Sequence, residues 1–353
     1  MKKYIILVIF IFLFSCGRWK TTKMKSAQMC LLNPGDSLGS VMLKYDDNDI
    51  LDISFKIAVH QGNIYVADNI LKRMQILNKN CEPVLLIGEK KSGIGENSPA
   101  RYSKFQFSII EAIAVDSNRN IFVQNSFTSS QKHNNVPGRD AGFALSYIPV
   151  FDQKGTLLYT LGKTGSPDMP FNAIESLTID KADRLFVITK SLDTWSVYRF
   201  LNKRRDFNIN FSESDFKDHE GKEAYSGKIE KVVAHQSGDE ILISVAYYHA
   251  ADFKYRKIFT YSIQKEKILA ASIIIPDPKN ELFNISNDKI YLWDIDEKNI
   301  RYMICNLKGD VINNISIKFP EAVNSFDEIL IDSSGNFYSY HGLKRGVEIL
   351  EWR

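Results

Sequence analysis

Several familiar signs of enzymatic or nucleic-acid function are missing from this chain of 353 residues. It contains no Gly-x-Ser-x-Gly elbow, no His-Glu-x-x-His motif, no P-loop and no Cys-x-x-Cys pair, so no catalytic residue is predicted. The chain also has no large net charge, because its 45 Lys and Arg residues nearly balance its 42 Asp and Glu residues. This balance gives no support to nucleic-acid binding. No segment is apolar over the roughly 20 residues that a bilayer-spanning helix needs.

Cysteine is also scarce. Its four positions are Cys16, Cys30, Cys81 and Cys305, and their spacings match no zinc-binding motif. If the protein is exported and Cys16 is lipidated, as the next features indicate, three thiols remain, which is an odd number. An exported protein lies in a compartment that permits disulfides. We expect Cys30, Cys81 and Cys305 to be buried or incidental thiols rather than metal ligands.

The first residues indicate export. Two lysines precede an apolar run over residues 4–14, which ends at Ser15, Cys16 and Gly17. A small residue before a cysteine at the end of such a run resembles the lipobox of bacterial lipoproteins, in which the cysteine, here Cys16, is lipidated. An ordinary secretory signal or a short membrane anchor is the alternative.

These features divide the chain into three parts. We expect a signal peptide over residues 1–15, a flexible tether over residues 16–36 and a folded domain over residues 37–353. The resemblance to lipoproteins implies a bacterial cell-envelope protein that is anchored to the lipid bilayer through acylated Cys16. It would lie on the inner or outer membrane, in the periplasm or at the surface.

A weak internal repeat fills the folded part. Each copy consists of an apolar strand, a tight polar turn and a second strand. The clear copies cover residues 57–68, 113–123 and 177–187, and the weaker copies cover residues 233–243, 283–292 and 329–338. Self-similarity with β patterning at a spacing of roughly 40–50 residues is typical of a β-propeller. We therefore predict an all-β, six-bladed β-propeller with four antiparallel strands in each blade.

One segment of the first blade supports a narrower resemblance. The run Lys72-Arg73-Met74-Gln75-Ile76-Leu77 resembles the NHL-repeat pattern, in which an arginine precedes a strand that ends in a polar turn. The resemblance covers most of the mature chain and is strongest in the first three blades. It implies the fold and not an activity.

The last blade lacks a strand. After residues 328–331 and 336–340, only residues 347–352 remain to form one more strand. The β-patterned segment at residues 40–45 is therefore predicted to add as the outer strand of the sixth blade. This arrangement would close the ring and cover an exposed strand edge.

Carboxylates recur at the start of the inner strands. A carboxylate lies four positions before the central apolar residue of the inner strand in several copies. These residues are Glu111, Glu175, Glu230, Glu281 and Asp327. Because inner strands surround the central channel, these side chains could form an acidic ring at one mouth of it. Such a ring could hold Ca²⁺, which favours carboxylate and carbonyl oxygens. Alternatively, each carboxylate pairs with a nearby basic residue such as Lys231.

Aromatic residues and histidines gather in the long connections, which are expected on the same face as the acidic ring. The predicted binding face contains Tyr102, Phe127, His133, His219, Tyr247, Tyr248 and His249. Long loops on a rigid scaffold are where binding residues concentrate. The alternative is that these side chains only pack the long loops down.

Two functions follow from these patterns. The first is a non-enzymatic binding or scaffold module that presents one propeller face to a protein, peptide or glycan. The second is a hydrolase that resembles calcium-dependent lactonases and related esterases, with its site at the channel mouth. That resemblance implies a mixed set of Glu, Asn and Asp ligands, whereas the set here is mostly Glu. The sequence therefore favours binding, without nucleic acid as a partner.

Overall fold

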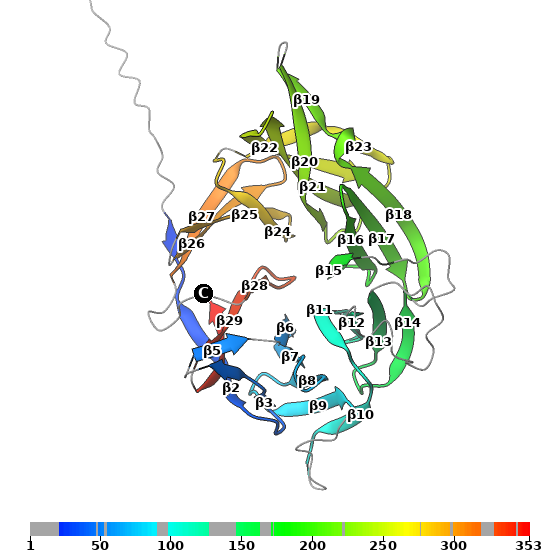
Figure 1. Cartoon of the computed structure of the whole chain (residues 1–353), viewed down its shortest axis with the longest axis vertical. Coiled ribbons are helices and arrows are strands. Elements are labelled where there is room, and N and C mark those ends of the chain that lie inside the picture. The colour runs from blue at the N-terminus through cyan, green and yellow to red at the C-terminus, as the bar shows by residue number, and fades with distance from the viewer. Residues whose placement is uncertain are drawn as a thin grey trace, which may run out of the picture.

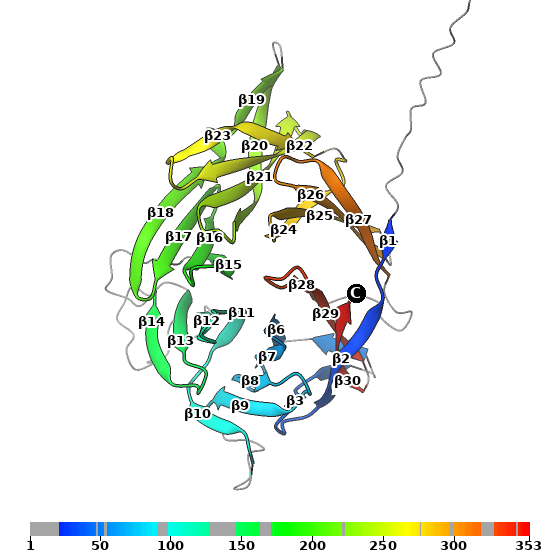
Figure 2. The ribbon, with the colours of Figure 1, turned by 180° about the vertical axis from the view of Figure 1, so that it is seen from behind.

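The computed structural model describes residues 21–46, 49–52, 55–89, 98–126, 146–162, 171, 173–220, 223–275, 277–296, 299–318, 328–343 and 345–353. Cys16, Phe127, His133 and Asp327 lie outside these residues. Six sheets of four or five strands surround a central axis (Figure 1), which confirms the predicted six-bladed β-propeller. The same ring is seen from behind in Figure 2.

The first three blades follow the chain in order. Blade one contains β6 (Phe55–His60), β7 (Asn63–Asp68), β8 (Arg73–Leu77), β9 (Pro83–Gly88) and β10 (Arg101–Lys104). Blade two contains β11 (Ile109–Val115), β12 (Ile121–Ser126), β13 (Ser146–Phe151) and β14 (Leu157–Leu161). Blade three contains β15 (Ala173–Ile179), β16 (Leu185–Ser191), β17 (Thr194–Leu201) and β18 (Arg204–Ser212).

Of the other three blades, blades five and six include strands from the N-terminal segment. Blade four contains β19 (Lys217–Glu220), β20 (Glu223–Ala234), β21 (Glu240–His249), β22 (Asp252–Ser262) and β23 (Lys267–Ile274). Blade five contains β24 (Glu281–Ser286), β25 (Lys289–Asp296), β26 (Asn299–Asn306), β27 (Val311–Lys318) and β1 (Thr22–Lys23). Blade six contains β28 (Glu328–Ile331), β29 (Phe337–Leu343), β30 (Gly346–Trp352), β2 (Ser26–Pro34) and β3 (Ser40–Val41).

Little else is regular. A small hairpin joins β4 (Lys44–Asp46) to β5 (Asp49–Asp52). The helical structure described is a single 3-10 turn, η2 (Glu213–Asp215). Within the part of the chain that the structure covers, no helix is long and apolar enough to cross a membrane.

Local sequence explains why the inner strands turn back so tightly. Between β6 and β7 the chain reverses over Gln61 and Gly62, whose φ angles are 49° and 76°. Two successive residues with positive φ match the right-handed twist of a two-residue hairpin, and glycine adopts such a φ without strain. The apolar residues on either side then alternate between the two faces of the blade.

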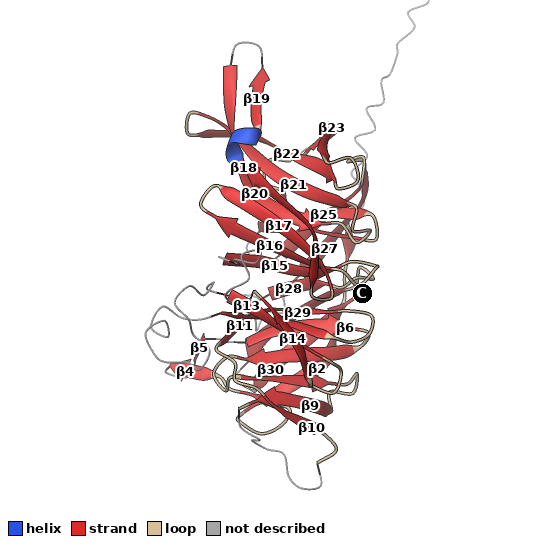
Figure 3. Cartoon of the chain, turned by 90° about the vertical axis from the view of Figure 1, so that its right-hand side faces the viewer, coloured by secondary structure: helices blue, strands red, loops and turns tan. Residues whose placement is uncertain are grey.

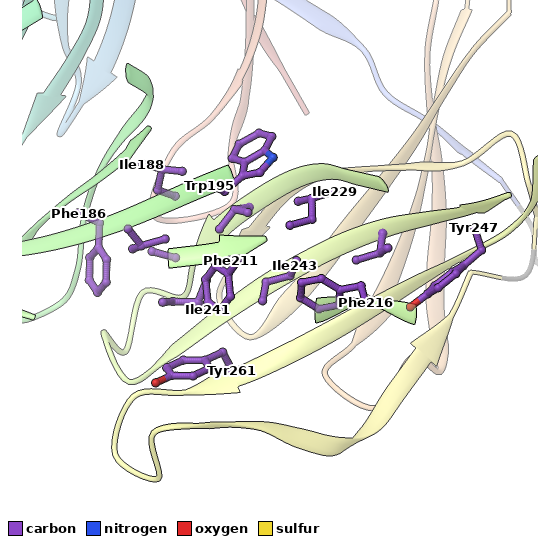
Figure 4. Close-up of a cluster of buried hydrophobic side chains, with 14 of the residues drawn as sticks. Phe186, Ile188, Trp195, Phe211, Phe216, Ile229, Ile241, Ile243, Tyr247 and Tyr261 are labelled. Atoms are coloured by element: carbon purple, nitrogen blue, oxygen red, sulfur yellow. The ribbon is translucent and has the colours of Figure 1, made fainter. Parts of the chain in front are cut away.

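The hydrophobic core lies between neighbouring blades. The cluster between blades three and four packs Trp195 and Phe211 against Ile229, Ile243 and Tyr247 (Figure 4). Each of these side chains is at most 3% exposed. Since burying one large apolar side chain contributes roughly 1.5–3 kcal/mol, contacts of this kind hold the ring together blade by blade.

Ring closure by the N-terminal segment is confirmed, but the predicted segment is wrong. The strand that pairs antiparallel with β30 is β2, in a register that runs from Ser26 opposite Trp352 to Leu32 opposite Val347. Part of the expected tether therefore belongs to the propeller. The segment predicted to close the ring supplies β3, which pairs parallel with the end of β2, and β4 of the small hairpin.

A buried arginine fixes the chain just after the closing strand. Arg73, which is 2% exposed, donates hydrogen bonds to the carbonyl oxygens of Asp36 (2.6 Å), Ser37 (2.9 Å) and Ser40 (2.9 Å). Gln75 donates a further hydrogen bond of 2.7 Å to the carbonyl of Ser40. The arginine of the NHL-like motif thus clamps residues 36–40 onto blade one.

A disulfide joins the first and last blades. Cys30 on β2 is bonded to Cys81, which lies in the turn between β8 and β9, and their Cα atoms are 5.8 Å apart. The expectation that these two are incidental thiols was therefore wrong. Cys305 is buried and free, as expected.

Candidate functional site

The recurrent glutamates mark a shared irregularity of the inner strands. In blades two, three and four, the register of the inner strand shifts at Glu111, Glu175 and Glu230 respectively, so that each is the extra residue of a β-bulge. Bulges bend a strand and redirect a side chain, and they occur near functional sites. The recurrence read from the sequence therefore reflects a real structural repeat in these three blades.

Blade five departs from the repeat. Its bulge lies at Phe283, between Leu282 and Asn284, rather than at the predicted Glu281. The inner strand there has one residue fewer between the bulge and the turn than its counterparts. In addition, Ile285 is the second-last residue of β24, whereas Val115 is the last residue of β11, so counting back four positions from Ile285 overshoots the bulge by two residues.

Two of the predicted carboxylates share one guanidinium. Arg256, 8% exposed, contacts both carboxylate oxygens of Glu230, with Nε–Oε2 at 2.6 Å and Nη2–Oε1 at 3.1 Å. Its Nη2 also lies 3.3 Å from Oε1 of Glu281. Burial lowers the pKa of Arg256, but the hydrogen bond and the charge of Glu230 outweigh burial and raise it. The single positive charge of Arg256 is thus shared between two carboxylates, with its bidentate contact made to Glu230.

Glu111 also has partners, and so does Glu328, the residue that follows the predicted Asp327 in the sequence. Glu111 accepts hydrogen bonds from Gln124 Nε2 at 2.6 Å and from the Ser126 hydroxyl. Glu328 accepts a hydrogen bond of 2.7 Å from the Tyr340 hydroxyl, and Lys56 Nζ lies 3.4 Å from the same carboxylate.

Lys231 occupies the position next to the bulge of blade four. Its Nζ lies 5.4 Å from the ring centroid of Phe283. Burial lowers the pKa of this lysine, although the charges of Glu281 and Glu175 act in the opposite direction. The mouth of the channel therefore carries interleaved charges of both signs, and not a purely acidic ring.

The donor set does not fit a calcium ion. No three His, Cys, Asp or Glu side chains come together in a metal-binding cluster among the residues that the structure describes. The carboxylates that sequence reasoning grouped are instead distributed between Arg256, Lys231 and neutral hydrogen-bond donors. Asp327 is outside the described residues, so its part in the predicted ring stays a prediction.

A cavity of about 690 Å³ occupies the central channel. Side chains from the inner strands line it, including Lys56, Glu111, Glu175, Asn284 and Glu328. His60 also lines this cavity, and burial lowers its pKa. Of the five predicted carboxylates, two therefore face a common space, Glu111 and Glu175.

Blade four extends beyond the rest of the ring. Its strands β20, β21 and β22 have 12, 10 and 11 residues, whereas the equivalent strands of blade one have 6, 6 and 5. The extra length, together with β19, projects past the rim (Figures 1 and 3). The long connections that were expected to carry His219, Tyr247, Tyr248 and His249 are therefore mostly strands.

Four rings form a row along this extension. His249 lies 5.9 Å from Tyr225, Tyr225 lies 5.6 Å from Tyr255, and Tyr255 lies 5.0 Å from Tyr247, all between ring centroids. Offset or edge-to-face contacts at these distances stabilise aromatic pairs by roughly 0.5–1.5 kcal/mol. The row therefore continues the core between blades three and four toward the end of the extension.

A charged pair anchors the row. The Tyr255 hydroxyl donates a hydrogen bond of 2.8 Å to Asp218, and Lys257 Nζ contacts the same carboxylate oxygen. Burial raises the pKa of Asp218, but the hydrogen bonds from Lys257 and Tyr255 outweigh burial and lower it. Lys257 also lies 5.3 Å and 5.6 Å from the rings of Tyr255 and Tyr247.

A second aromatic pair lies near the tip. The rings of Tyr248 and Phe253 are 5.8 Å apart, and the guanidinium of Arg256 lies 4.8 Å from the Phe253 centroid. Tyr248 and Phe253 are half-buried, while His249 is exposed. The end of the hairpin thus presents aromatic surface to solvent.

The predicted binding face is brought together only in part. Tyr247, Tyr248 and His249 end β21, and His219 lies on the neighbouring β19. Tyr102 lies on β10, at the opposite end of the ring (Figures 1 and 2), and its hydroxyl bonds to the carbonyls of Gly88 and Glu89 at 3.1 and 3.0 Å. Tyr102 therefore packs its own connection down, as the alternative interpretation expected.

Sequence reasoning missed Asp218 and Lys257. One signal could have located Lys257. Residues 253, 255 and 257 alternate with period two, as do residues 247 and 249, and this pattern is typical of a hairpin rather than a loop. Asp218 left no such signal, because it lies on β19, which pairs with β20 and not with the strand that carries Lys257.

Comparisons with known proteins assign no family to this chain. No protein-family model and no curated protein matches the sequence. Among solved structures, the chain is similar to the polysaccharide lyase Uly1 (TM-score 0.44, 9% identity, covering 93% of this chain and 98% of that one). It is also similar to the AfRom2 CNH domain (0.43, 11%, 94% and 96%) and to the gluconolactonase XC5397 from Xanthomonas campestris (0.42, 11%, 82% and 82%). The chain is a six-bladed β-propeller, and no narrower family, the NHL-repeat family included, is shown.

Proposed function

We propose that this protein is a membrane-anchored binding module whose binding surface is the blade-four extension. The accessible side chains of that surface are His219, Tyr248, His249, Phe253 and Tyr255, whereas Tyr225 and Tyr247 are buried in the core that supports it. A protein or peptide partner fits it best, because aromatic residues supply large, rigid contact area at protein interfaces. A glycan is the other ligand that an aromatic surface of this kind can take.

The observation that carries the proposal is the length of blade four. The ring closes through blade six and needs no extension of blade four, so the added strands serve another purpose than closure. Their row of rings is held in place by Asp218 and Lys257. A surface that is already rigid before binding loses less conformational entropy when a partner docks.

Membrane anchoring is the second part of the proposal. It rests on the lipobox-like residues that end at Cys16. An acyl chain contributes about 0.8 kcal/mol per buried CH₂ group, and stable anchoring takes two or more chains. An anchored propeller would keep its binding surface at a short distance from the bilayer of the cell envelope.

The lactonase-like alternative has the central cavity as its support. Glu111 and Glu175 line that cavity, but the described carboxylates do not assemble a metal site. A screen of lactone and ester hydrolysis by the purified protein tests this alternative directly. Hydrolysis that disappears in Glu175→Gln would favour it over binding.

Photo-crosslinking in cells tests the binding surface. A photoreactive amino acid replaces His249 at the exposed tip, and in a matched control it replaces Lys308, an exposed residue in the turn between β26 and β27. We expect a discrete adduct from position 249 and none from position 308. Tyr248→Ala combined with Phe253→Ala should reduce the adduct. Equal labelling from both positions, or none from position 249, would contradict the proposed surface.

A further inference from the structure

The blades differ in whether another strand covers the edge of their outer strand. In blades one, five and six, a short strand from elsewhere in the chain runs parallel to the outer strand: β10 on β9, β1 on β27 and β3 on β2. An uncovered edge presents unpaired N–H and C=O groups to any other strand. The chain thus covers part of the outer edge in half of its blades.

Two further edges are interrupted. In blade two, β14 is short, with five residues, and its pairing with β13 shifts register at Val150. In blade four, β23 skips two residues between Ile268 and Ser272 in its pairing with β22. Shortness and bulges both make an edge a poor template for another strand.

The edge of blade three is interrupted at its start, where β18 bulges at Asp206 and carries Arg204, Arg205 and Asp206, but it is regular beyond that point. Residues 207–212 of β18 pair one-to-one with residues 194–199 of β17, without a bulge. None of these six residues is charged. In the described part of the chain, no strand lies on the outer side of β18. The strand runs along the rim of the ring (Figures 1 and 2).

We propose that two copies of this protein associate through antiparallel pairing of their β18 strands, about a two-fold axis at Ile209. This pairing joins two four-stranded sheets into one continuous sheet. Symmetric contacts of this kind require a surface that is complementary to itself, and β18 meets that requirement in two independent ways.

The first is the match of side chains across the axis. With Ile209 opposite itself, Asn208 of one copy faces Asn210 of the other, and Phe207 faces Phe211. One face of the joined sheet then pairs amides with amides, and on the other face Phe207 and Phe211 pack in the core between blades three and four of their own copy. Asn208 and Asn210 are exposed in the single chain. Matched cross-strand pairs of this kind stabilise a sheet.

The second is the distribution of charge. Exposed Lys203 and Arg204 lie at the start of the strand, and Glu213 and Asp215 follow its end. Antiparallel pairing in this register places Arg204 of one copy beside Glu213 and Asp215 of the other, at both ends of the interface. A parallel pairing would place like charges opposite each other, which is destabilising. The charges therefore select the symmetric, antiparallel arrangement.

Disulfide trapping tests the pairing with the full chain in its membrane. One tagged copy carries Asn208→Cys and a second, differently tagged copy carries Asn210→Cys, because these positions face each other across the axis. Mild oxidation should give a dimer that contains both tags. The matched control is Asn313→Cys, which is also an exposed asparagine on an outer strand, β27. Control copies should form no dimer above the background of the unsubstituted chain.

Charge reversal separates a specific interface from random collision. Arg204→Glu places acidic groups together at both ends and should weaken the dimer about tenfold, given up to about 1 kcal/mol for each exposed ion pair. Adding Glu213→Lys should restore trapping, which a merely structural effect of either substitution would not do. Absence of the mixed dimer, equal trapping through Asn313→Cys, crosslinks to another protein, or no response to Arg204→Glu would each overturn the proposal.

Discussion

The disulfide between Cys30 and Cys81 should contribute a large share of the stability of the closed ring. It joins residues 51 positions apart. A crosslink that closes a loop of this length lowers the entropy of the unfolded chain enough to stabilise the native state by about 4 kcal/mol. That is a substantial part of the 5–15 kcal/mol or so by which folded domains are usually stable.

Reduction is the cleanest perturbation, because it removes the bond and leaves both side chains in place. We expect the free energy of unfolding, measured by urea titration with tryptophan fluorescence, to fall by about 4 kcal/mol in reductant. The control is the double variant Cys30→Ala/Cys81→Ala, whose stability should not respond to reductant. Cys305 is buried and unpaired, and it is the same in both proteins.

Two results would refute this reasoning. Mass spectrometry of the oxidised protein could show that Cys30 and Cys81 are not bonded. Alternatively, the bond could be fully reduced while the free energy of unfolding changes by less than about 1 kcal/mol, well below the value expected from loop length. The second result would mean that the N-terminal segment stays in place through β2 pairing and the Arg73 clamp alone.

Three further predictions concern the anchor, the channel and the extension. Cys16→Ala should accumulate as unprocessed precursor and lose labelling by a fatty-acid probe, and equal labelling would exclude lipidation there. Calcium and chelator should leave the melting temperature unchanged, because Arg256 contacts Glu230 and Glu281 and the described carboxylates form no metal-binding cluster; a calcium-dependent rise of several degrees would show a cation site. The lowered pKa of Asp218 means that its ionised form stabilises the native state above its unfolded value of 3.8, and that this contribution is lost as the pH falls through the lowered value. Acid titration of the tyrosine fluorescence should therefore show a local transition below about pH 4 that is absent in Asp218→Asn.

The blades themselves were predictable from the sequence. Alternating apolar residues on both sides of a tight polar turn specify a hairpin locally, so the limits of β8 and β28 match the predicted ranges. The glutamates at positions 111, 175 and 230 were found for a physical reason, since each is the extra residue of a bulge. The prediction was wrong at Glu281, because the bulge of blade five lies closer to the turn of its hairpin than in blades two, three and four, at Phe283.

The remaining errors come from long-range contacts. Nothing local distinguishes β2, half of which is exposed, from a polar tether until β30 is present to pair with it. The Cys30–Cys81 bond depends on that pairing, so its partners could not be chosen from spacing. The aromatic and charged residues 247–256 were read as a loop, although tyrosine and phenylalanine favour strands and the turn itself occupies only two residues.

The disulfide and the closing strand together imply an order of assembly. Cys30 and Cys81 both belong to the first quarter of the chain, whereas β28, β29 and β30 are the last strands to be synthesised. Once blade one has formed, the bond can hold β2 beside it while five other blades are still incomplete. The final blade then adds to a strand that is already in position, and this shortens the search for a contact between opposite ends of the chain, the kind of contact that slows folding most. In a cell that exports the chain with its N-terminus first, early oxidation of Cys30 and Cys81 would place β2 where the last blade can pair with it.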